Sequence, residues 1–249
     1  DHLALVMADV SGKGVPAALV MAVTNSLFRS ISAHEEQPED IVSLMNKAFS
    51  QQNTQDMFLT LFLGVLDLTT GKLNYCNAGH NAPMIVESRK SKVESLNVLA
   101  NLPLGIVDDF PYQAQSMQLE KGDLLFLYTD GLTEAENSDH DQFGEQRMAE
   151  VLASLTDSRP RHVSDTMQAA VEAFVGEAEQ SDDLTMMAIR YQTAAIVMRN
   201  DIQQIPTLAE WIDGLGIPEE LNMPINLALE EIVSNVMLYA YPHDKSGHD

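Results

Sequence analysis

Short apolar runs and segments of helical periodicity alternate along the first part of this chain. Leu3–Ala8 is continuously apolar, which is typical of a strand covered on both faces of a sheet. Pro16 then stands where the first turn of a helix tolerates proline, and apolar residues recur at helical spacing to about Ser32. A second helical pattern follows Pro38. The pattern predicts one strand followed by two helices.

The middle of the chain has the pattern of a series of strands. Met57–Leu68 and Lys72–Cys76 flank a turn and predict a β-hairpin. Further strands are predicted at Met84–Val86, Tyr112–Leu119, Leu124–Thr129 and Leu184–Tyr191, amphipathic helices at Phe143–Leu155 and Val163–Glu179, and a polar surface segment at Ser88–Leu99. Helices that are segregated from antiparallel strands indicate an α+β fold.

A second, shorter part follows a predicted domain boundary near residue 192. Its pattern predicts a strand at Ala194–Met198 and helices at about Ile205–Leu215 and Met223–Tyr239. A segment of about 55 residues is short for an independent domain. We expect it to be the start of a domain that continues further, and we expect both ends of the chain to be cuts through a larger protein.

Charge and composition exclude several classes of partner. Lys and Arg total 14 against 37 Asp and Glu, a net charge of -23, which disfavours nucleic acids and anionic lipid surfaces. No apolar stretch approaches the ~20 residues of a membrane span, and no secretory signal pattern is present. The single cysteine, Cys76, lies in an apolar run, which is typical of a core residue in a reducing compartment. We therefore expect a cytoplasmic protein without nucleic-acid binding or membrane insertion.

Acidic residues stand at the ends of three predicted strands. Asp9 and Asp130 each follow an apolar run and enter a glycine-containing turn, and Asp182 and Asp183 precede the last strand. Any one of these segments is more often simply a turn. Three of them together favour convergent carboxylates, because Mg²⁺ and Mn²⁺ prefer oxygen ligands and the cation offsets the cost of clustering the charges.

Five segments, in order, give the chain a family resemblance. They are Ala8–Ala18 (ADVSGKGVPAA), Asn77–Asn81 (NAGHN), Leu102–Gly105 (LPLG), Tyr128–Ala135 (YTDGLTEA) and Asp182–Thr185 (DDLT). Together they resemble the signatures of the SpoIIE/RsbU-type phosphatases, which belong to the metal-dependent PPM superfamily of serine/threonine phosphatases. The resemblance covers residues 1–192.

The resemblance implies a four-layer α-β-β-α sandwich with a two-metal Mn²⁺ or Mg²⁺ site. It implies that Asp9 and the carbonyl of Val10 bind one metal, that Asp130 and Asp182 bind the other, and that Asp183 is a neighbouring or alternative ligand. A metal-activated water would hydrolyse phosphoserine or phosphothreonine. The bridging Asp of the family lies in a Gly-Gly-Asp strand that is absent from these residues, so we expect this chain alone to bind metal poorly.

Two further polar residues allow more than one interpretation. His80 could act as an acid near the leaving group, but a lone histidine in a demanding loop more often bonds to the backbone, and we favour that role. Lys13 could contact phosphate or point into solvent.

A second resemblance covers Leu227–Asn235, which is similar to the N-box of GHKL ATPases, specifically the anti-sigma-factor serine kinases. By this resemblance Asn235 would hold the Mg²⁺ of Mg-ATP and Glu231 would act as base. The motif that should follow appears as Leu238–Pro242 with its histidine replaced, and the Gly-rich ATP boxes are not in the sequence. ATP-Mg binding is therefore expected only of a complete domain.

A phosphatase joined to a serine-kinase-like domain resembles bacterial partner-switching regulators. The implied substrate is a phosphorylated STAS-domain protein, an antagonist of an anti-sigma factor, and the implied upstream neighbour is a sensor or receiver domain. Two alternatives remain open: a non-catalytic partner-binding module, and a regulator whose main activity is the C-terminal ATP-dependent kinase.

Overall fold

The computed structural model describes residues 2–52, 57–89, 92–178, 182–192, 202–215, 217 and 219–235. The chain divides into two compact units, Asp1–Gln192 and Thr193–Asp249. Each unit is described by itself. The predicted strand Ala194–Met198, the last residues of the helix predicted to Tyr239 and the motif Leu238–Pro242 lie outside the described residues.

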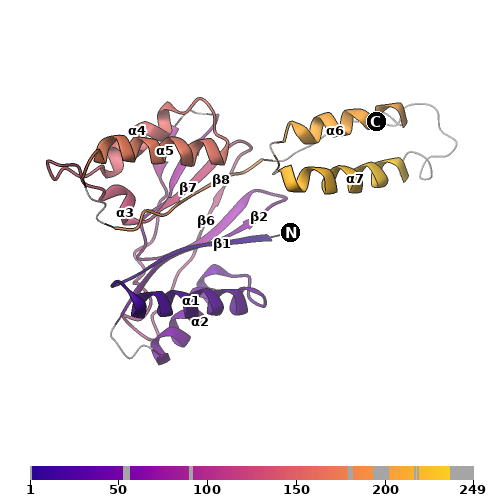
Figure 1. The fold of residues 1–249 in the computed structure, drawn as a ribbon. Helices are drawn as coiled ribbons and strands as arrows, with labels where there is room; N and C mark the ends of the chain where they lie inside the picture. Colours follow the sequence, from indigo (N-terminus) through magenta and orange to yellow (C-terminus); the bar gives the residue numbers. More distant parts are fainter. Residues whose placement is uncertain are drawn as a thin grey trace. The chain divides into compact units, whose positions relative to one another are not determined.

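The first unit contains two antiparallel sheets of four described strands each (Figure 1). Sheet A has the order β1-β2-β3-β6, with bounds His2–Val10, Leu59–Asp67, Lys72–Ala78 and Gln115–Gln118. Sheet B has the order β5-β4-β7-β8, with bounds Lys92–Ser95, Met84–Glu87, Leu124–Tyr128 and Met186–Arg190. In sheet A, Asp9 pairs with Thr60, and in sheet B, Tyr128 pairs with Met186. Both of these pairs lie at strand ends that carry candidate site residues.

Helices cover the outer face of each sheet (Figure 1). The helices are α1 (Val15–Ser32) and α2 (Pro38–Gln52) on sheet A, and α3 (Asp130–Thr133), α4 (Gly144–Ser154) and α5 (Pro160–Val175) on the side of sheet B. Three apolar cores separate the layers, one between helices and sheet A, one between the sheets, and one between sheet B and its helices. The predicted α+β class and the four-layer sandwich are confirmed.

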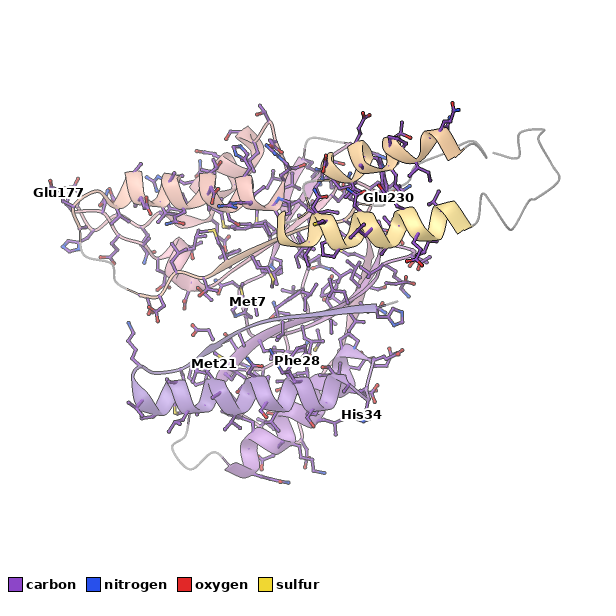
Figure 2. All side chains as sticks on the ribbon, turned by 45° about the vertical axis from the view of Figure 1, so that its right-hand side comes forward. Met7, Met21, Phe28, His34, Glu177 and Glu230 are labelled. Atoms are coloured by element: carbon purple, nitrogen blue, oxygen red, sulfur yellow. The ribbon has the colours of Figure 1, made fainter. Side chains whose placement is uncertain are left out.

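The alternation of side chains along the strands builds these cores. Leu61 and Leu63 of β2 face the helices, whereas Phe62 between them faces sheet B. Phe62 stacks on Tyr75 with ring centroids 5.8 Å apart, inside the core between the sheets. In Figure 2, Met21 on α1 lies between that helix and sheet A, and Met7 of β1 lies on the opposite side of the strand.

The elements differ from the sequence pattern at three places. The segment predicted as a polar excursion contains β5, whose residues are mostly exposed and so lack an alternating apolar signal. Only Gln115–Gln118 of the strand predicted at Tyr112–Leu119 pairs, with β3. The turn expected at Asp130 is the start of α3, a single helical turn too short to show periodicity.

Helix α1 also differs from the expectation that no apolar stretch suits a membrane. Its 18 residues are long and apolar enough to cross one by length and composition, with a mean hydropathy of 1.2. One such helix is weak evidence of a span, because a helix that packs on a core passes the same test. Val20, Phe28 and Ile31 of α1 pack against the core between the helices and sheet A.

In the second unit, the described elements are a short 3₁₀ turn and two helices. Their bounds are Ile202–Gln204, Ile205–Asp213 (α6) and Glu219–Asn235 (α7). Leu208 and Ile212 are buried on α6, whereas Leu227 and Ile232 of α7 are exposed. Glu231 is exposed on α7, and Asn235 is the last residue of that helix.

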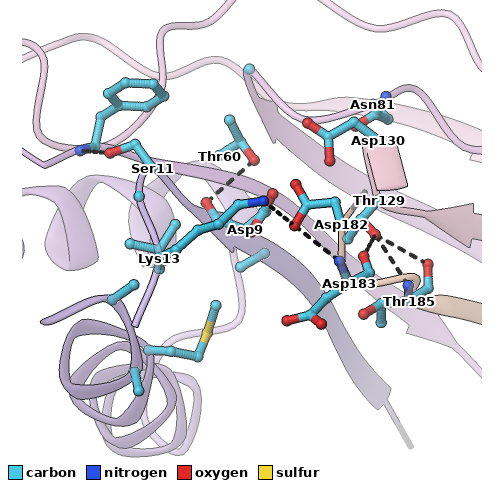
Figure 3. Close-up of a pocket in the computed structure, with 18 of the residues that line it drawn as sticks. Asp9, Ser11, Lys13, Thr60, Asn81, Thr129, Asp130, Asp182, Asp183 and Thr185 are labelled. Carbon is cyan, nitrogen blue, oxygen red and sulfur yellow. Dashed lines mark hydrogen bonds and ion pairs between the residues drawn. The ribbon is translucent and has the colours of Figure 1, made fainter. Parts of the chain in front are cut away.

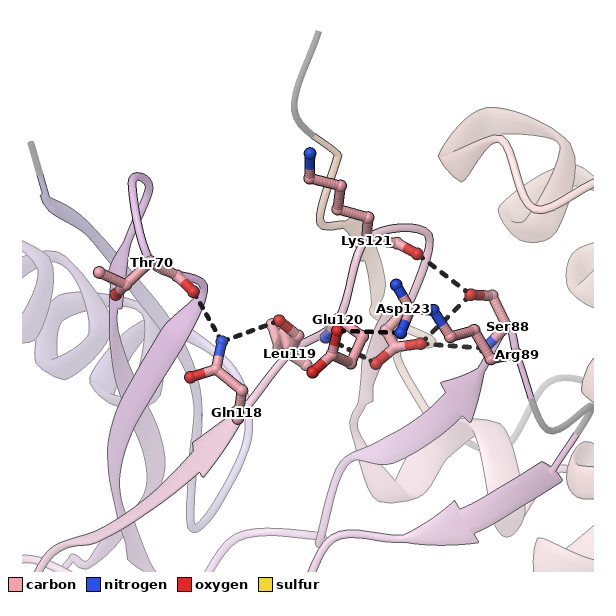
Figure 4. A network of polar contacts seen from close by, with 8 residues as sticks. All are labelled: Thr70, Ser88, Arg89, Gln118, Leu119, Glu120, Lys121 and Asp123. Atoms are coloured by element: carbon pink, nitrogen blue, oxygen red, sulfur yellow. Dashed lines mark hydrogen bonds and ion pairs between the residues drawn. The ribbon is translucent and has the colours of Figure 1, made fainter.

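A buried carboxylate closes the end of sheet B remote from the candidate site (Figure 4). One oxygen of Asp123 accepts hydrogen bonds from the backbone N–H of Ser88 at 2.9 Å and from its hydroxyl at 3.3 Å, and the other accepts from the N–H of Glu120 at 2.8 Å. The backbone of Asp123 also accepts from the N–H of Tyr191 at 2.9 Å. One residue therefore ties the turn before β7 to the ends of β4 and β8.

We expect Asp123→Ala to destabilise the protein by about 1–3 kcal/mol, because it removes the buried acceptor of three hydrogen bonds. Urea unfolding of the variant measures the loss. The matched control is Glu120→Ala, which removes only an exposed ion pair to Arg89 at 3.5 Å and should cost no more than about 1 kcal/mol. Equal effects of the two substitutions would contradict the role given to Asp123.

Candidate active site

Four aspartates from the two sheets line one cavity of about 1040 Å³. Asp9 lies near the end of β1 in sheet A, Asp130 follows β7, and Asp182 and Asp183 precede β8 in sheet B. Figure 3 shows Asp9, Asp130 and Asp182 gathered at the centre of the cavity. The structure thus brings together residues up to 174 positions apart (183 − 9), as the sequence predicts.

Two further residues of interest, Val10 and Glu134, also line this cavity. Val10 lines it from the last position of β1, where its backbone pairs with Leu59 and its side chain is buried. Glu134, directly after α3, adds a fifth carboxylate. Sequence analysis did not single out Glu134, although its place in the Tyr128–Ala135 segment was a signal that could have found it.

The two acidic segments of sheet B are held together by Thr129. Its N–H donates to the carbonyl of Thr185 at 3.0 Å, and its hydroxyl accepts from the N–H of Thr185 at 3.2 Å. Beside it, Gly131 packs so closely on this segment that a Cβ would overlap the carbonyl oxygen of Asp183. Glycine at 131 therefore allows Asp130 to approach Asp183.

The glycine-containing turn after β1 forms the opposite wall. The N–H of Ser11 donates to the carbonyl of Phe58 at 2.9 Å, and the Ser11 hydroxyl accepts from the N–H of Phe58 at 2.8 Å. Gly12 and Gly14 have φ of 102° and 81°, values that favour glycine. Between them Lys13 extends across the cavity to Asp182, with Nζ 3.2 Å from Oδ1 (Figure 3).

The charges in the cavity affect the aspartates differently. Burial raises the pKa of Asp9 above its usual value of 3.8, and the charges of Asp130, Asp182 and Asp183 raise it further against the N–H of Val10. The pKa of Asp182 is lowered, first by a hydrogen bond from the N–H of Asp183 and then by Lys13. Burial and the neighbouring like charges therefore disfavour the charged form of Asp9.

The donor set fits a hard divalent cation. All the candidate ligands are carboxylate or carbonyl oxygens, and the repulsion that raises the pKa of Asp9 is what a bound dication would offset. Within the described ranges, no three side chains of His, Cys, Asp or Glu already form a group placed to hold a metal ion. The carboxylates share the cavity without converging on one point.

His80 lies behind this cavity and does not line it. Its ring Nδ1 is 2.9 Å from the hydroxyl of Thr60, and its backbone N–H donates to the side-chain oxygen of Asn77 at 2.8 Å. Burial lowers the pKa of His80 to about 4, against the opposing charge of Asp130. A neutral, buried imidazole at physiological pH supports the structural role that the sequence favours, although the ring bonds to a side chain.

Two buried asparagines hold the remaining motif loops. Asn101 donates to the carbonyls of Asn77 and Gln113, each at 3.0 Å. Asn46 of α2 donates to the carbonyl of Asp108 at 2.7 Å and accepts from the N–H of Gly105 at 2.8 Å. The two asparagines thus hold both motif segments in place, and Gly79 and Asn81 of the first segment line the cavity. Sequence reasoning missed Asn46, because a single asparagine in a helix gives no distinctive signal.

We expect Asp9→Asn to raise the melting temperature of the metal-free protein. Folding raises the Asp9 pKa, so its charged form is disfavoured in the folded state, and a neutral isostere removes that penalty. The gain should be largest near neutral pH and shrink as the pH falls toward 3.8, where the carboxyl of the unfolded chain is also protonated.

Thermal unfolding without metal tests this, with Asp157→Asn as the control of opposite sign. Hydrogen bonds from Arg159 lower the Asp157 pKa to about 2, so its charged form is favoured in the folded state. The control should lower the melting temperature slightly. A melting temperature of Asp9→Asn below that of the wild type would contradict the view that burial and the neighbouring carboxylates disfavour the charged form of Asp9.

Comparisons with known proteins place this fold and cavity in a family. The model of the family described as Stage II sporulation protein E (SpoIIE) matches residues 1–192. Protein IcfG of Synechocystis is 30% identical over 219 residues, which are 76% of this chain and 34% of that protein. Phosphoserine phosphatase RsbU of Bacillus subtilis is 30% identical over 134 residues, which are 54% of this chain and 40% of that protein.

Among solved structures, the RsbU and RsbW domains of Rv1364c from Mycobacterium tuberculosis match with a TM-score of 0.74 at 28% identity. The match covers 98% of this chain and 71% of that one. The PP2C phosphatase domain of SpoIIE from Bacillus subtilis, at 24% identity and a TM-score of 0.66, covers 76% of this chain and 54% of that one and supports the fold. The chain spans between a third and two fifths of the two curated relatives named above. Through residues 1–192, this chain belongs to the SpoIIE family of PPM-type phosphatase domains.

Proposed function

We propose that the protein is a metal-dependent serine/threonine phosphatase that acts in the control of a sigma factor. The observation that carries this proposal is the cavity in which Asp9 of sheet A lies with Asp130, Asp182 and Asp183 of sheet B. Family membership and the similarity to phosphoserine phosphatase RsbU support the same activity. Mn²⁺ or Mg²⁺ is the cofactor that an all-oxygen donor set suits.

In this proposal the aspartates divide the metal ligation between the two sheets. Asp9 and the carbonyl of Val10 hold one cation, and Asp130 and Asp182 hold the other, with Asp183 beside them. Two divalent cations held there would supply charge neutralisation and an acidified water for the hydrolysis of a phosphomonoester. Thr129 and Gly131 fix the separation of the Asp130 and Asp183 segments, so that the ligands are positioned before substrate arrives.

A cysteine nucleophile offers no competing mechanism. Cys76 is 1% exposed in the core between the helices and sheet A, and burial raises the pKa of its thiol to about 12. The thiolate that would attack phosphorus is therefore not formed at physiological pH. The neutral His80 likewise lacks the acidic imidazolium proton that would protonate a leaving group at that pH.

The substrate that we propose is the phosphoserine or phosphothreonine of a STAS-domain antagonist of an anti-sigma factor. Membership in the SpoIIE family and the similarity to RsbU support this assignment. A sensor or receiver domain in the same protein would supply the activating signal.

The second unit is proposed to be the first part of a GHKL serine-kinase-like domain. The match to the RsbU and RsbW domains of Rv1364c supports this, because it covers 98% of the chain and therefore extends beyond residue 192. Glu231 and Asn235, one helical turn apart on α7, are the residues we assign to ATP-Mg in the complete domain. The kinase is a second activity, and the aspartate cavity favours the phosphatase as the function of residues 1–192.

In a protein that also carries the family's Gly-Gly-Asp strand, we expect Asp130→Asn to lower Mn²⁺-dependent hydrolysis of a phosphorylated STAS protein at least about 100-fold, because even residues behind the ligands of a metal contribute 10–100-fold. Phosphate release and the mass of the substrate report turnover, and circular dichroism reports the fold. Asp139→Asn, in the exposed segment after α3, is the matched control and should retain activity. Unchanged turnover in Asp130→Asn would remove Asp130 from the ligands, and a folded wild-type protein without hydrolysis would favour the binding module.

A further inference from the structure

Lys13 combines a fixed backbone with a mobile side chain at the mouth of the acidic cavity. The turn that carries it is tied to the backbone of Phe58 by two hydrogen bonds of Ser11, one through its N–H and one through its hydroxyl. The Lys13 side chain itself is 72% exposed, and its Nζ lies 3.2 Å from Oδ1 of Asp182. Figure 3 shows it reaching over Asp9 to this carboxylate. The ammonium group can therefore move while its origin stays in place.

Lys13 differs in charge from the acidic residues that line the cavity. Among the described residues that line it, five are carboxylates, namely Asp9, Asp130, Glu134, Asp182 and Asp183, and the one cationic side chain is Lys13. A phosphoryl group has two negative charges at neutral pH and is repelled by such a lining. Metal ions would neutralise the carboxylates that bind them, and further phosphate oxygens then need a cationic partner.

Lys13 cannot contact Asp182 and a phosphate group at the same time. A divalent cation on Asp182 would compete for the oxygen that Lys13 contacts. At that short distance it would also repel the ammonium group. The displaced side chain has a flexible four-carbon stem and three N–H donors, which suit a phosphate as a point charge. An exposed ion pair contributes little to stability, so its release costs little.

We propose that Lys13 is a phosphate-binding residue: it is the counter-ion of Asp182 in the metal-free protein, and its ammonium group would bind the phosphoryl group when Asp182 holds a divalent cation. The inference rests on the proposed function and adds a specific residue for substrate and product phosphate. The simpler alternative is a solvated lysine whose ion pair with Asp182 has no part in binding.

Two measurements on Lys13→Met should move in opposite directions. Calorimetric titration with Mn²⁺ should give affinity about two- to fivefold tighter than wild type, because the competitor for Asp182 is gone and an exposed pair contributes at most this much. In the Mn²⁺-loaded protein, binding of inorganic phosphate, measured as product inhibition and by calorimetry, should weaken about tenfold or more, because a charge-assisted contact is lost.

The matched control is Lys121→Met, which removes the same charge from an exposed turn at the opposite end of β7 (Figure 4). It should leave both affinities within about twofold of wild type, because the pocket charges are screened at that distance. Lys13→Arg should retain phosphate binding within about threefold, because it keeps the cation on a side chain of similar length.

Unchanged phosphate affinity in Lys13→Met, or equal changes in Lys13→Met and Lys121→Met, would overturn the inference. Weaker Mn²⁺ binding in Lys13→Met would also overturn it, because the lysine would then support the ligands instead of competing for one. These outcomes are separate from the failure of the proposed function, which is the absence of hydrolysis in the wild-type protein. The Mn²⁺ titration and the phosphate titration both remain measurable in a protein that does not turn over.

Discussion

The packing of two apolar sheet faces forces like charges together at one end of this molecule. Leu5 and Met7 of β1 pack with Leu125 and Leu127 of β7 in the core between the sheets, and this packing sets the end of β1 beside the end of β7. Asp9 thereby lies on one cavity with Asp130 and its neighbours, and burial, followed by the charges of these neighbours, raises the pKa of its carboxyl. Apolar burial, which is the larger contribution to stability, sustains an arrangement that electrostatics alone would disperse.

Hydrogen bonds to the backbone hold the segments that carry these charged side chains. Thr129 joins the Asp130 and Asp183 segments through its backbone and hydroxyl, and the bonds of Ser11 fix the turn that carries Lys13. The backbone of the acidic segments is thus held in place, and a bound cation would offset the repulsion among their carboxylates. In the metal-free protein, Lys13 provides part of that compensation at Asp182.

Much of this arrangement could be predicted from the sequence, because apolar runs end at each acidic segment. The pattern located Asp9, Asp130, Asp182 and Asp183 at strand ends, and the structure places all of them on one cavity. Strand β5 escaped prediction because an exposed edge strand has a polar sequence. The contacts of His80 with Thr60 and of Asn46 with the loop at Gly105 join residues 20 and 59 positions apart, and no local pattern encodes such partners.

Paramagnetic broadening by Mn²⁺ tests the central claim, that residues of both sheets ligate one metal centre. Amide resonances of the protein are followed by NMR during a titration with Mn²⁺, with Ca²⁺ or Mg²⁺ as the diamagnetic reference. The account predicts that the amides of Val10 in sheet A and of Gly131 and Asp183 in sheet B broaden together at the same Mn²⁺ concentration. Broadening confined to one sheet, or spread evenly over the acidic surface, would contradict it.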